Sequence, residues 1–109
     1  MASEVMKVKL NAALSNSEVD LLTVASGHTY TILGVTLCET DAAAETFDLY
    51  VDPLGGSNDT YIYKAQALGS NETFEHTGRI VLEATDVLYA IAGGSANIDV
   101  FITYLDQTL

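Results

Sequence analysis

A hydrophobic alternation with a period of two runs through most of the chain and is interrupted at short intervals by glycine, asparagine and serine. Near the N-terminus, for example, Met6, Val8 and Leu10 alternate with Lys7 and Lys9. Because successive side chains of a β-strand point to opposite faces, such alternation is typical of strands with one buried face. The pattern predicts strands at residues 6–10, 19–24, 30–37, 47–51, 61–68, 73–82, 86–92 and 98–104. About eight short strands joined by short turns are expected to form an antiparallel β-sandwich or jelly roll.

Local breaks in the alternation add detail to this prediction. The apolar phase of the third strand shifts from even to odd positions at Leu33 and Gly34, which indicates a β-bulge with Gly34 at positive φ. Gly78 is expected to interrupt the sixth strand. Residues 42–45 are the only candidate for a helical turn, and Pro53 is expected to end the fourth strand because proline cannot donate to a sheet.

The size of the chain favours one domain. It has 109 residues, of which 49% are hydrophobic, and a single cysteine, Cys38. We therefore expect residues 1–109 to form one β-sandwich domain. A chain of this size buries roughly 65% of its unfolded surface on folding, which is enough for a two-layer core. One cysteine cannot form a disulfide within the chain, and we expect the protein to fold in a reducing cytoplasm.

The charge balance excludes several classes of partner. Fifteen acidic and four basic residues give a formal net charge of −11. A nucleic-acid backbone is bound by clustered lysines and arginines, so we predict no nucleic-acid partner. Anionic membranes are disfavoured for the same reason, and no apolar run approaches the length of about 18 residues that a spanning helix needs. Lys7, Lys9 and Asn11 interrupt the only N-terminal apolar stretch, so no secretory signal is expected.

Several predicted strands are apolar on both faces. Phe101 and Leu105 lie opposite the alternating apolar set of the last strand, and Leu88 lies opposite Val87 and Tyr89. A strand with one face in water should alternate cleanly, so these strands need a second cover. The simplest cover is another copy of the chain. The predicted oligomer-interface residues are therefore Leu88, Phe101 and Leu105.

Residues that could carry catalysis are few. His28 lies in a turn signal and His76 near a strand break, and neither belongs to a nucleophile motif. We therefore predict no catalytic residues, no enzyme activity and no cofactor. Cys38 has no neighbouring lysine or arginine to activate its thiol, and we interpret it as a small buried hydrophobe. The histidines and Cys38 lack metal-ligand spacing, whereas a structural calcium ion at the acidic residues 39–45 or 52–59 remains an open alternative.

Six tyrosines dominate the aromatic content, and tryptophan is absent. At strand positions these tyrosines are expected to pack in the core or in an interface. Tyr50 lies opposite the apolar face of its predicted strand and is the best candidate for an exposed contact. Exposed tyrosines also form the floor of carbohydrate sites, so a carbohydrate-binding module is the alternative from another class of function.

Three segments resemble small structural proteins of tailed-phage virions. Residues 29–57, TYTILGVTLCETDAAAETFDLYVDPLGGS, are similar to a TYTVLGVTLCNT strand, a short turn, an LYVVP strand and a glycine-serine loop in that group. Residues 79–88, RIVLEATDVL, resemble the group's LEAGDVI turn, with Thr85 in place of the usual glycine. Residues 98–106, IDVFITYLD, are similar to its last strand. The resemblance extends over about residues 20–106 and implies a virion β-sandwich without catalytic residues.

From this resemblance we expect a non-enzymatic structural protein of a bacteriophage particle, located in the virion and assembled in the host cytoplasm. The expected form is an oligomer, with a trimer favoured, that decorates or cements the capsid by contacts with the major capsid protein or other virion proteins. A neck, tail or fibre-base position is the alternative within the virion. An acidic chain suits such a role because it binds protein partners and is repelled by DNA.

Overall fold

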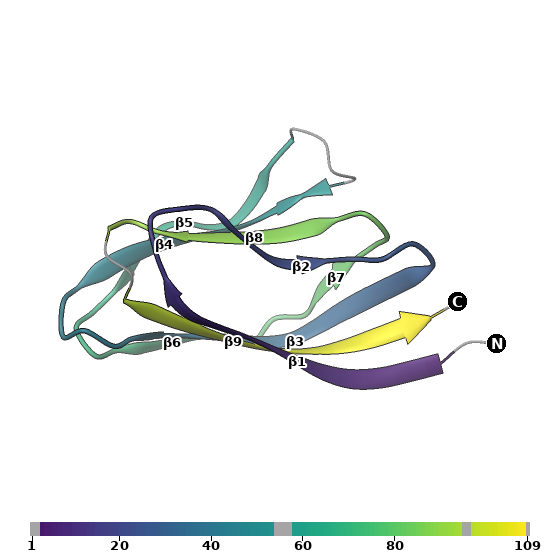
Figure 1. The fold of residues 1–109 in the computed structure, drawn as a ribbon, viewed down its shortest axis with the longest axis horizontal. Helices are drawn as coiled ribbons and strands as arrows, with labels where there is room; N and C mark the ends of the chain where they lie inside the picture. Colours follow the sequence, from purple (N-terminus) through teal and green to yellow (C-terminus); the bar gives the residue numbers. More distant parts are fainter. Residues whose placement is uncertain (1–2, 54–57, 95–96, 109) are drawn as a thin grey trace.

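The computed structural model describes residues 3–53, 58–94 and 97–108, which form nine β-strands and no α-helix (Figure 1). None of these described residues lies in a helix that could cross a membrane. The expected all-β sandwich is confirmed. The strands are β1 (Ser3–Leu14), β2 (Val19–Thr23), β3 (His28–Glu39), β4 (Glu45–Asp52), β5 (Thr60–Leu68), β6 (Thr73–His76), β7 (Ile80–Leu82), β8 (Val87–Ala92) and β9 (Ile98–Thr108).

The strands form two antiparallel sheets that face each other (Figure 1). Sheet A has the strand order β1-β9-β3-β6, and β7 pairs with β3 next to β6. Sheet B has the order β2-β8-β4-β5. The first and last strands of the chain pair over nearly their whole length, so β1 is an edge strand of sheet A and β9 lies inside that sheet.

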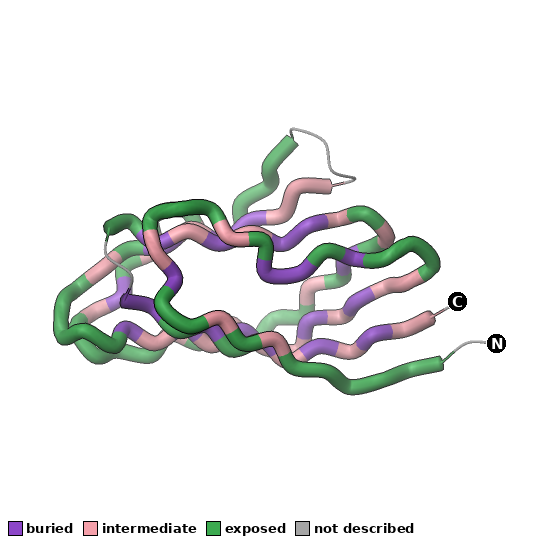
Figure 2. Tube along the Cα trace, viewed as in Figure 1, coloured by how far each residue is buried: buried purple, intermediate pink, exposed green. Residues whose placement is uncertain are grey.

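Apolar side chains from both sheets fill the space between them. Buried and exposed positions alternate along the inner strands, as Figure 2 shows for β9. Burial of a leucine, isoleucine or phenylalanine side chain contributes about 1.5–3 kcal/mol, so this layer supplies most of the stabilising free energy. The largest core side chains with less than 2% exposure include Leu14, Ile32, Leu37, Phe47, Leu49, Leu68, Leu82, Leu88, Ile98 and Ile102.

Three of the local predictions hold and one is wrong. β4 ends at Asp52, immediately before Pro53, as expected. The sixth predicted strand is interrupted as expected, and its parts are β6 and β7. The register between β3 and β9 shifts between Ile32 and Gly34, which confirms the bulge, but Gly34 does not have a positive φ. Residues 42–45, the only candidate for a helical turn and too short to be stable alone, are a bend that leads into β4. The Glu39 carboxylate accepts hydrogen bonds from the backbone N–H groups of Asp41 and Ala43 in this bend.

Candidate assembly surface

The outer surface of sheet A carries a group of exposed apolar side chains. The register of β1 against β9 places Leu10 beside Phe101 and Met6 beside Leu105. On the other side of β9, Thr31 pairs with Leu105 and with Val81 of β7. Paired residues of an antiparallel sheet point to the same face, so these side chains share one surface. We call it the outer apolar face; it comprises Met6, Val8, Leu10, Val81, Phe101 and Leu105.

The exposure of these side chains is high for their size. Leu10 is 62% exposed, Met6 61% and Phe101 49%, whereas Leu105 is half-buried. Scattered exposed apolar residues are common on soluble proteins, but neighbouring ones on adjacent strands indicate an interaction surface. The outer apolar face has this second arrangement, because its residues are neighbours in register.

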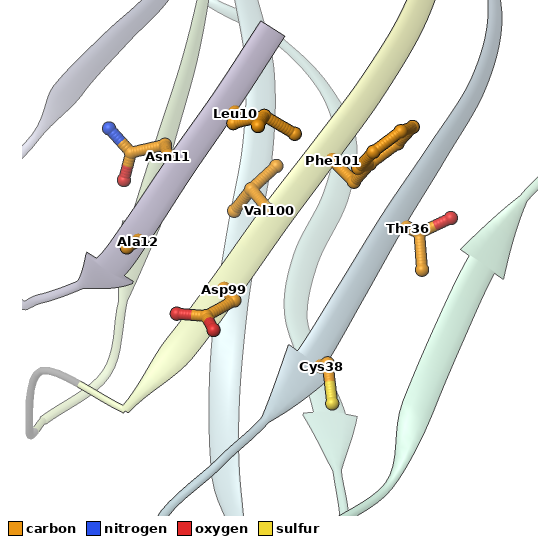
Figure 3. Close-up of a pocket in the computed structure, with 8 residues that line it drawn as sticks. All are labelled: Leu10, Asn11, Ala12, Thr36, Cys38, Asp99, Val100 and Phe101. Carbon is orange, nitrogen blue, oxygen red and sulfur yellow. The ribbon is translucent and has the colours of Figure 1, made fainter.

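A shallow hollow adjoins Phe101 on this face. It has a volume of about 310 Å³, and its lining includes Leu10 from β1, Phe101 from β9 and both Thr36 and Cys38 from β3 (Figure 3). The Phe101 ring stands beside the hollow over the β9–β3 pair, and Leu10 lies on the β1 side of β9 (Figure 3). Cys38 is therefore half-buried on the outer side of β3, where its phase opposite to Leu37 places it, and it is less buried than the sequence predicts.

The outer apolar face is almost free of charge. The outward positions between Met6 and Leu10, and their partners on β9 and β3, are apolar side chains, threonines and a glycine. The outward acidic residues of the described strands of this sheet lie at the margin of the face: Glu4 at one end, Asp99 at the other and Glu75 on β6. For a chain of net charge −11, a neutral centre is the part of the surface that another copy can approach with the least repulsion.

The predicted interface residues divide between the surface and the core. Phe101 and Leu105 lie on the outer apolar face, as just described. Leu88 is fully buried between the sheets, so it offers no surface to a second copy and this prediction needs correction. Its strand is apolar on both faces because sheet B packs one face on the core and covers much of the other with tyrosine side chains.

Tyr50 is also placed differently from the sequence prediction. It is 4% exposed, although it points away from the core, because Tyr61 and Tyr89 on the neighbouring strands flank its ring. The ring centroids of these neighbours lie 4.8 and 5.5 Å from that of Tyr50. The Tyr50 hydroxyl donates a hydrogen bond to Glu18. The expectation that Tyr50 is an exposed contact is therefore wrong.

Sequence reasoning missed the part of the face that β1 contributes. It treated Met6, Val8 and Leu10 as the alternating set of a half-exposed strand, and the structure turns all three outward. Lys7 lies on the other face of β1, beside Tyr104, with its side chain 44% exposed. Lys7 Nζ lies 2.8 Å from Asp106 Oδ2, and His28 Nδ1 lies 2.7 Å from Asp106 Oδ1. The signal that could have revealed this phase is the acidic residue at an otherwise apolar position near the end of β9.

The histidines and acidic turns have structural partners. His28 pairs with Asp106, and His76 Nδ1 lies 2.8 Å from the hydroxyl of Tyr63. Glu39 accepts hydrogen bonds from the backbone N–H groups of Asp41, Ala43 and Asn71 and from the side chain of Asn97.

Through these hydrogen bonds the Glu39 carboxylate holds the turns around it together. Burial tends to raise the pKa of Glu39, and the four hydrogen bonds outweigh it and hold the pKa below its ordinary value. Within residues 3–53, 58–94 and 97–108, no group of three or more histidine, cysteine, aspartate or glutamate side chains is arranged to hold a metal ion.

Comparisons with known proteins identify solved structures with a similar fold. No family model matches the chain, and no curated protein matches it. Among solved structures, it is similar to a chain of the acidic stable capsid of Helicobacter pylori bacteriophage KHP30, at 15% identity and TM-score 0.54, covering 100% of this chain and 94% of that one. It is also similar to a chain of the Bacillus endospore appendages, described as disulfide-linked pili, at 13% identity and TM-score 0.53, covering 100% and 88%.

A third similar structure is a chain of the T13 IBDV viral particle, at 9% identity and TM-score 0.50, covering 96% of this chain and 35% of that one. At such identities the likeness is one of fold. The chain has a β-sandwich of the kind found in viral capsid proteins, and a spore appendage has the same kind of sandwich.

Proposed function

We propose that this protein is a non-enzymatic structural component of a bacteriophage particle, and that it assembles with copies of itself through the outer apolar face. The observation that carries the proposal is the neutral, exposed apolar centre of sheet A in a chain of net charge −11. Water-exposed apolar area is unfavourable by about 25 cal/mol per Å², so a cover over this face stabilises the assembly. The resemblance of residues 20–106 to virion proteins and the capsid-type fold support the phage setting.

Within the particle, we favour a decoration or cement role on the capsid, as a trimer. Linked copies bind a repeating shell with avidity, because each engaged copy raises the effective concentration of the next. The outer apolar face then joins the copies, and the remaining surface contacts the major capsid protein. A neck, tail or fibre-base position uses the same self-contact with a different partner.

The self-contact is tested by the mass of the particle in solution. Phe101→Asp and Val8→Asp each place a carboxylate on the outer apolar face, and each is expected to shift the protein from oligomer to monomer in light scattering and sedimentation. Ala67→Asp, at an exposed position of β5 in sheet B, is the charge-matched control and should leave the oligomer intact. Circular dichroism establishes that all three variants are folded. An unchanged mass in both Phe101→Asp and Val8→Asp contradicts the proposal.

The position on the particle is tested by co-sedimentation. Purified protein is mixed with phage heads that lack it and, separately, with tails. Binding to heads at a stoichiometry that follows the shell lattice supports decoration. If the protein binds tails or necks and does not bind heads, the decoration role is rejected in favour of a neck, tail or fibre-base position.

A fibre subunit is the second candidate, and the fold likeness to a chain of the spore appendages favours it. A fibre requires a head-to-tail contact that does not close. Electron microscopy of the purified protein distinguishes the two, since a closed oligomer gives discrete particles and an open one gives filaments that lengthen with concentration.

A further inference from the structure

The outer surface of sheet B has a different chemistry from that of sheet A. The registers of this sheet place Asp20, Tyr89, Tyr50 and Tyr61 in one row across β2, β8, β4 and β5. The planes of Tyr50 and Tyr89 differ by 28°, and those of Tyr50 and Tyr61 by 34°. The rings of Tyr50 and Tyr89 are therefore stacked, the ring of Tyr61 is tilted against that of Tyr50, and Tyr50 lies between its two neighbours.

The β5 end of this tyrosine row already holds a cation. Lys64 Nζ lies 4.4 Å from the centroid of the Tyr61 ring and 3.7 Å from Asp48 Oδ2. An ammonium group over a tyrosine ring is attracted by the negative face of the ring, and a nearby carboxylate adds to that attraction. One end of the row thus shows the combination of ring, carboxylate and cation.

The β2 end has the ring and the carboxylate. Asp20 is the register partner of Tyr89, and its Oδ2 accepts a hydrogen bond from Thr23, which orients the carboxylate. Lys64 is the one lysine or arginine in β2, β4, β5 and β8. No basic residue of these described strands takes the place at Tyr89 that Lys64 takes at Tyr61.

The field at this end is negative. The Tyr50 hydroxyl brings Glu18 to the row, and Tyr89 is half-buried. Burial and the charges of Glu18 and Asp20 raise the pKa of the Tyr89 phenol. Asp20 and Glu18 are exposed, so a cation placed here gains a surface attraction from the carboxylates and a further attraction from the half-buried Tyr89 ring.

We propose that the Asp20 end of the tyrosine row is a docking site for a lysine or arginine side chain on a basic segment of a partner protein. The ring of Tyr89 and the carboxylate of Asp20 give that side chain the two contacts that Lys64 has with Tyr61 and Asp48. A sugar ring needs an open aromatic face to lie on. A cation over Tyr89 needs such a face as well, but the Asp20 carboxylate beside that ring attracts a cation and not a neutral sugar, so the row favours a cationic protein side chain over a glycan. This goes beyond the proposed function, because it assigns the second sheet a partner of opposite charge.

The probe for this site is a short peptide in which arginine alternates with glycine, compared with the same peptide containing citrulline, its uncharged analogue. The wild-type protein should bind the arginine peptide, with an affinity that falls as salt is raised. Asp20→Asn and Tyr89→Leu should each weaken binding by roughly 5- to 10-fold, the effect of losing about 1–1.4 kcal/mol. Tyr89→Phe keeps the ring and should bind as the wild type does.

A matched control separates a site from general attraction to an acidic protein. Glu75→Gln removes one charge from an exposed position on β6 in sheet A and should leave peptide affinity unchanged. Equal losses in Glu75→Gln and Asp20→Asn overturn the proposal, because binding then follows net charge alone. Equal binding of the arginine and citrulline peptides also overturns it. So does binding of a neutral oligosaccharide that Tyr89→Leu abolishes and Asp20→Asn spares.

The outcomes of the peptide-binding test do not depend on self-association through the outer apolar face. Asp20 and Tyr89 lie on sheet B, and the oligomer is expected to keep its mass in both variants. A protein that forms the oligomer but fails the peptide test refutes the docking site alone. Loss of the oligomer in the sheet A variants, with peptide binding retained, leaves the docking site in place.

Discussion

Lys7 Nζ donates a hydrogen bond of 2.8 Å to Asp106 Oδ2 across the β1–β9 pair. The Asp106 carboxylate is almost fully buried, and its other oxygen lies 2.7 Å from His28 Nδ1. Because neighbouring side chains of a strand point to opposite faces, the inward Lys7 places Met6 and Val8 on the outside. The ion pair thus favours the orientation of β1 in which Met6 and Val8 belong to the outer apolar face.

Asp106→Asn is expected to destabilise the fold by roughly 1–3 kcal/mol at neutral pH, because Lys7 and His28 lose the charge they bind. The hydrogen bonds from His28 and Lys7 hold the pKa of Asp106 below its ordinary value of 3.8. A carboxyl with a lowered folded pKa stabilises the protein above its unfolded pKa, and this contribution is lost as pH falls through the folded value. Urea unfolding at neutral and acid pH should therefore show a smaller loss on acidification in the variant.

Asp41→Asn is the control for this experiment, since Asp41 is exposed in the bend after β3. It should change stability by no more than a few tenths of a kcal/mol at neutral pH. If Asp106→Asn unfolds at the same urea concentration as the wild type at neutral pH, the Asp106 carboxylate does not hold β1 in place.

Thr85 occupies a backbone conformation that suits glycine. Its φ is 71°, in the left-handed region that glycine adopts without strain. The turn is kept by hydrogen bonds from Asp86 N to Glu83 O, at 3.0 Å, and from Thr85 N to Val24 O, at 2.9 Å. A β-branched residue in the left-handed region costs about 1–2 kcal/mol, and this turn is held in spite of that cost.

Thr85→Gly should raise the stability by about 1 kcal/mol, because relief of the strain exceeds the added flexibility of the unfolded chain. Ala84→Gly is the matched control: Ala84 has a negative φ in the same turn, so glycine there should lower stability. Thermal and urea unfolding measure both. Equal effects of the two substitutions would rule out backbone strain at Thr85.

The alternation of side chains predicts the sandwich because it reports the strand period directly, and the strands it predicts at residues 19–24, 30–37 and 98–104 coincide closely with β2, β3 and β9. The same pattern indicates that β8 is apolar on both faces, but it does not indicate which part of the structure covers each face. Leu88 is covered by the opposite sheet, and Phe101 has no such cover in the structure. The difference depends on the order of strands, which the pattern of a single strand does not contain.

Long-range partners explain the other differences. Tyr50 is buried by Tyr61 and Tyr89, which the sheet order brings to its two sides. The outward phase of β1 depends on Asp106, 99 residues from Lys7. The short-range phase shift at Gly34 needed no such partner, and the bulge there was predicted correctly.

Gly27 and Gly34 should respond differently to alanine. Gly27 has a φ of 80°, with open space around a would-be Cβ, so Gly27→Ala tests backbone strain alone and should cost about 1 kcal/mol. Gly34 lacks a positive φ, and the nearest atom to its would-be Cβ is the His76 carbonyl oxygen at 3.8 Å. Gly34→Ala should therefore be neutral or slightly stabilising. A destabilised Gly34→Ala variant would show that the bulge itself requires glycine.

Glu39 is hydrogen-bonded to three turns, so its substitution should change the stability of the whole fold at acid pH. Its carboxylate binds the bend after β3, Asn71 before β6 and Asn97 before β9. Because the pKa of Glu39 is held below its ordinary value of 4.5, the ionised group stabilises the fold above that pH. This contribution is lost as pH falls through the lowered folded pKa.

Glu39→Gln is expected to unfold at lower temperature at neutral pH, since an amide cannot accept all four hydrogen bonds in the same geometry. The melting temperature of the variant should also fall less steeply below about pH 5, because the group that takes up a proton on unfolding has been removed. Glu83→Gln, at an exposed position, is the control and should follow the wild-type curve. Parallel acid limbs for wild type and Glu39→Gln would mean that other carboxylates govern acid unfolding, with Asp106 the first to examine.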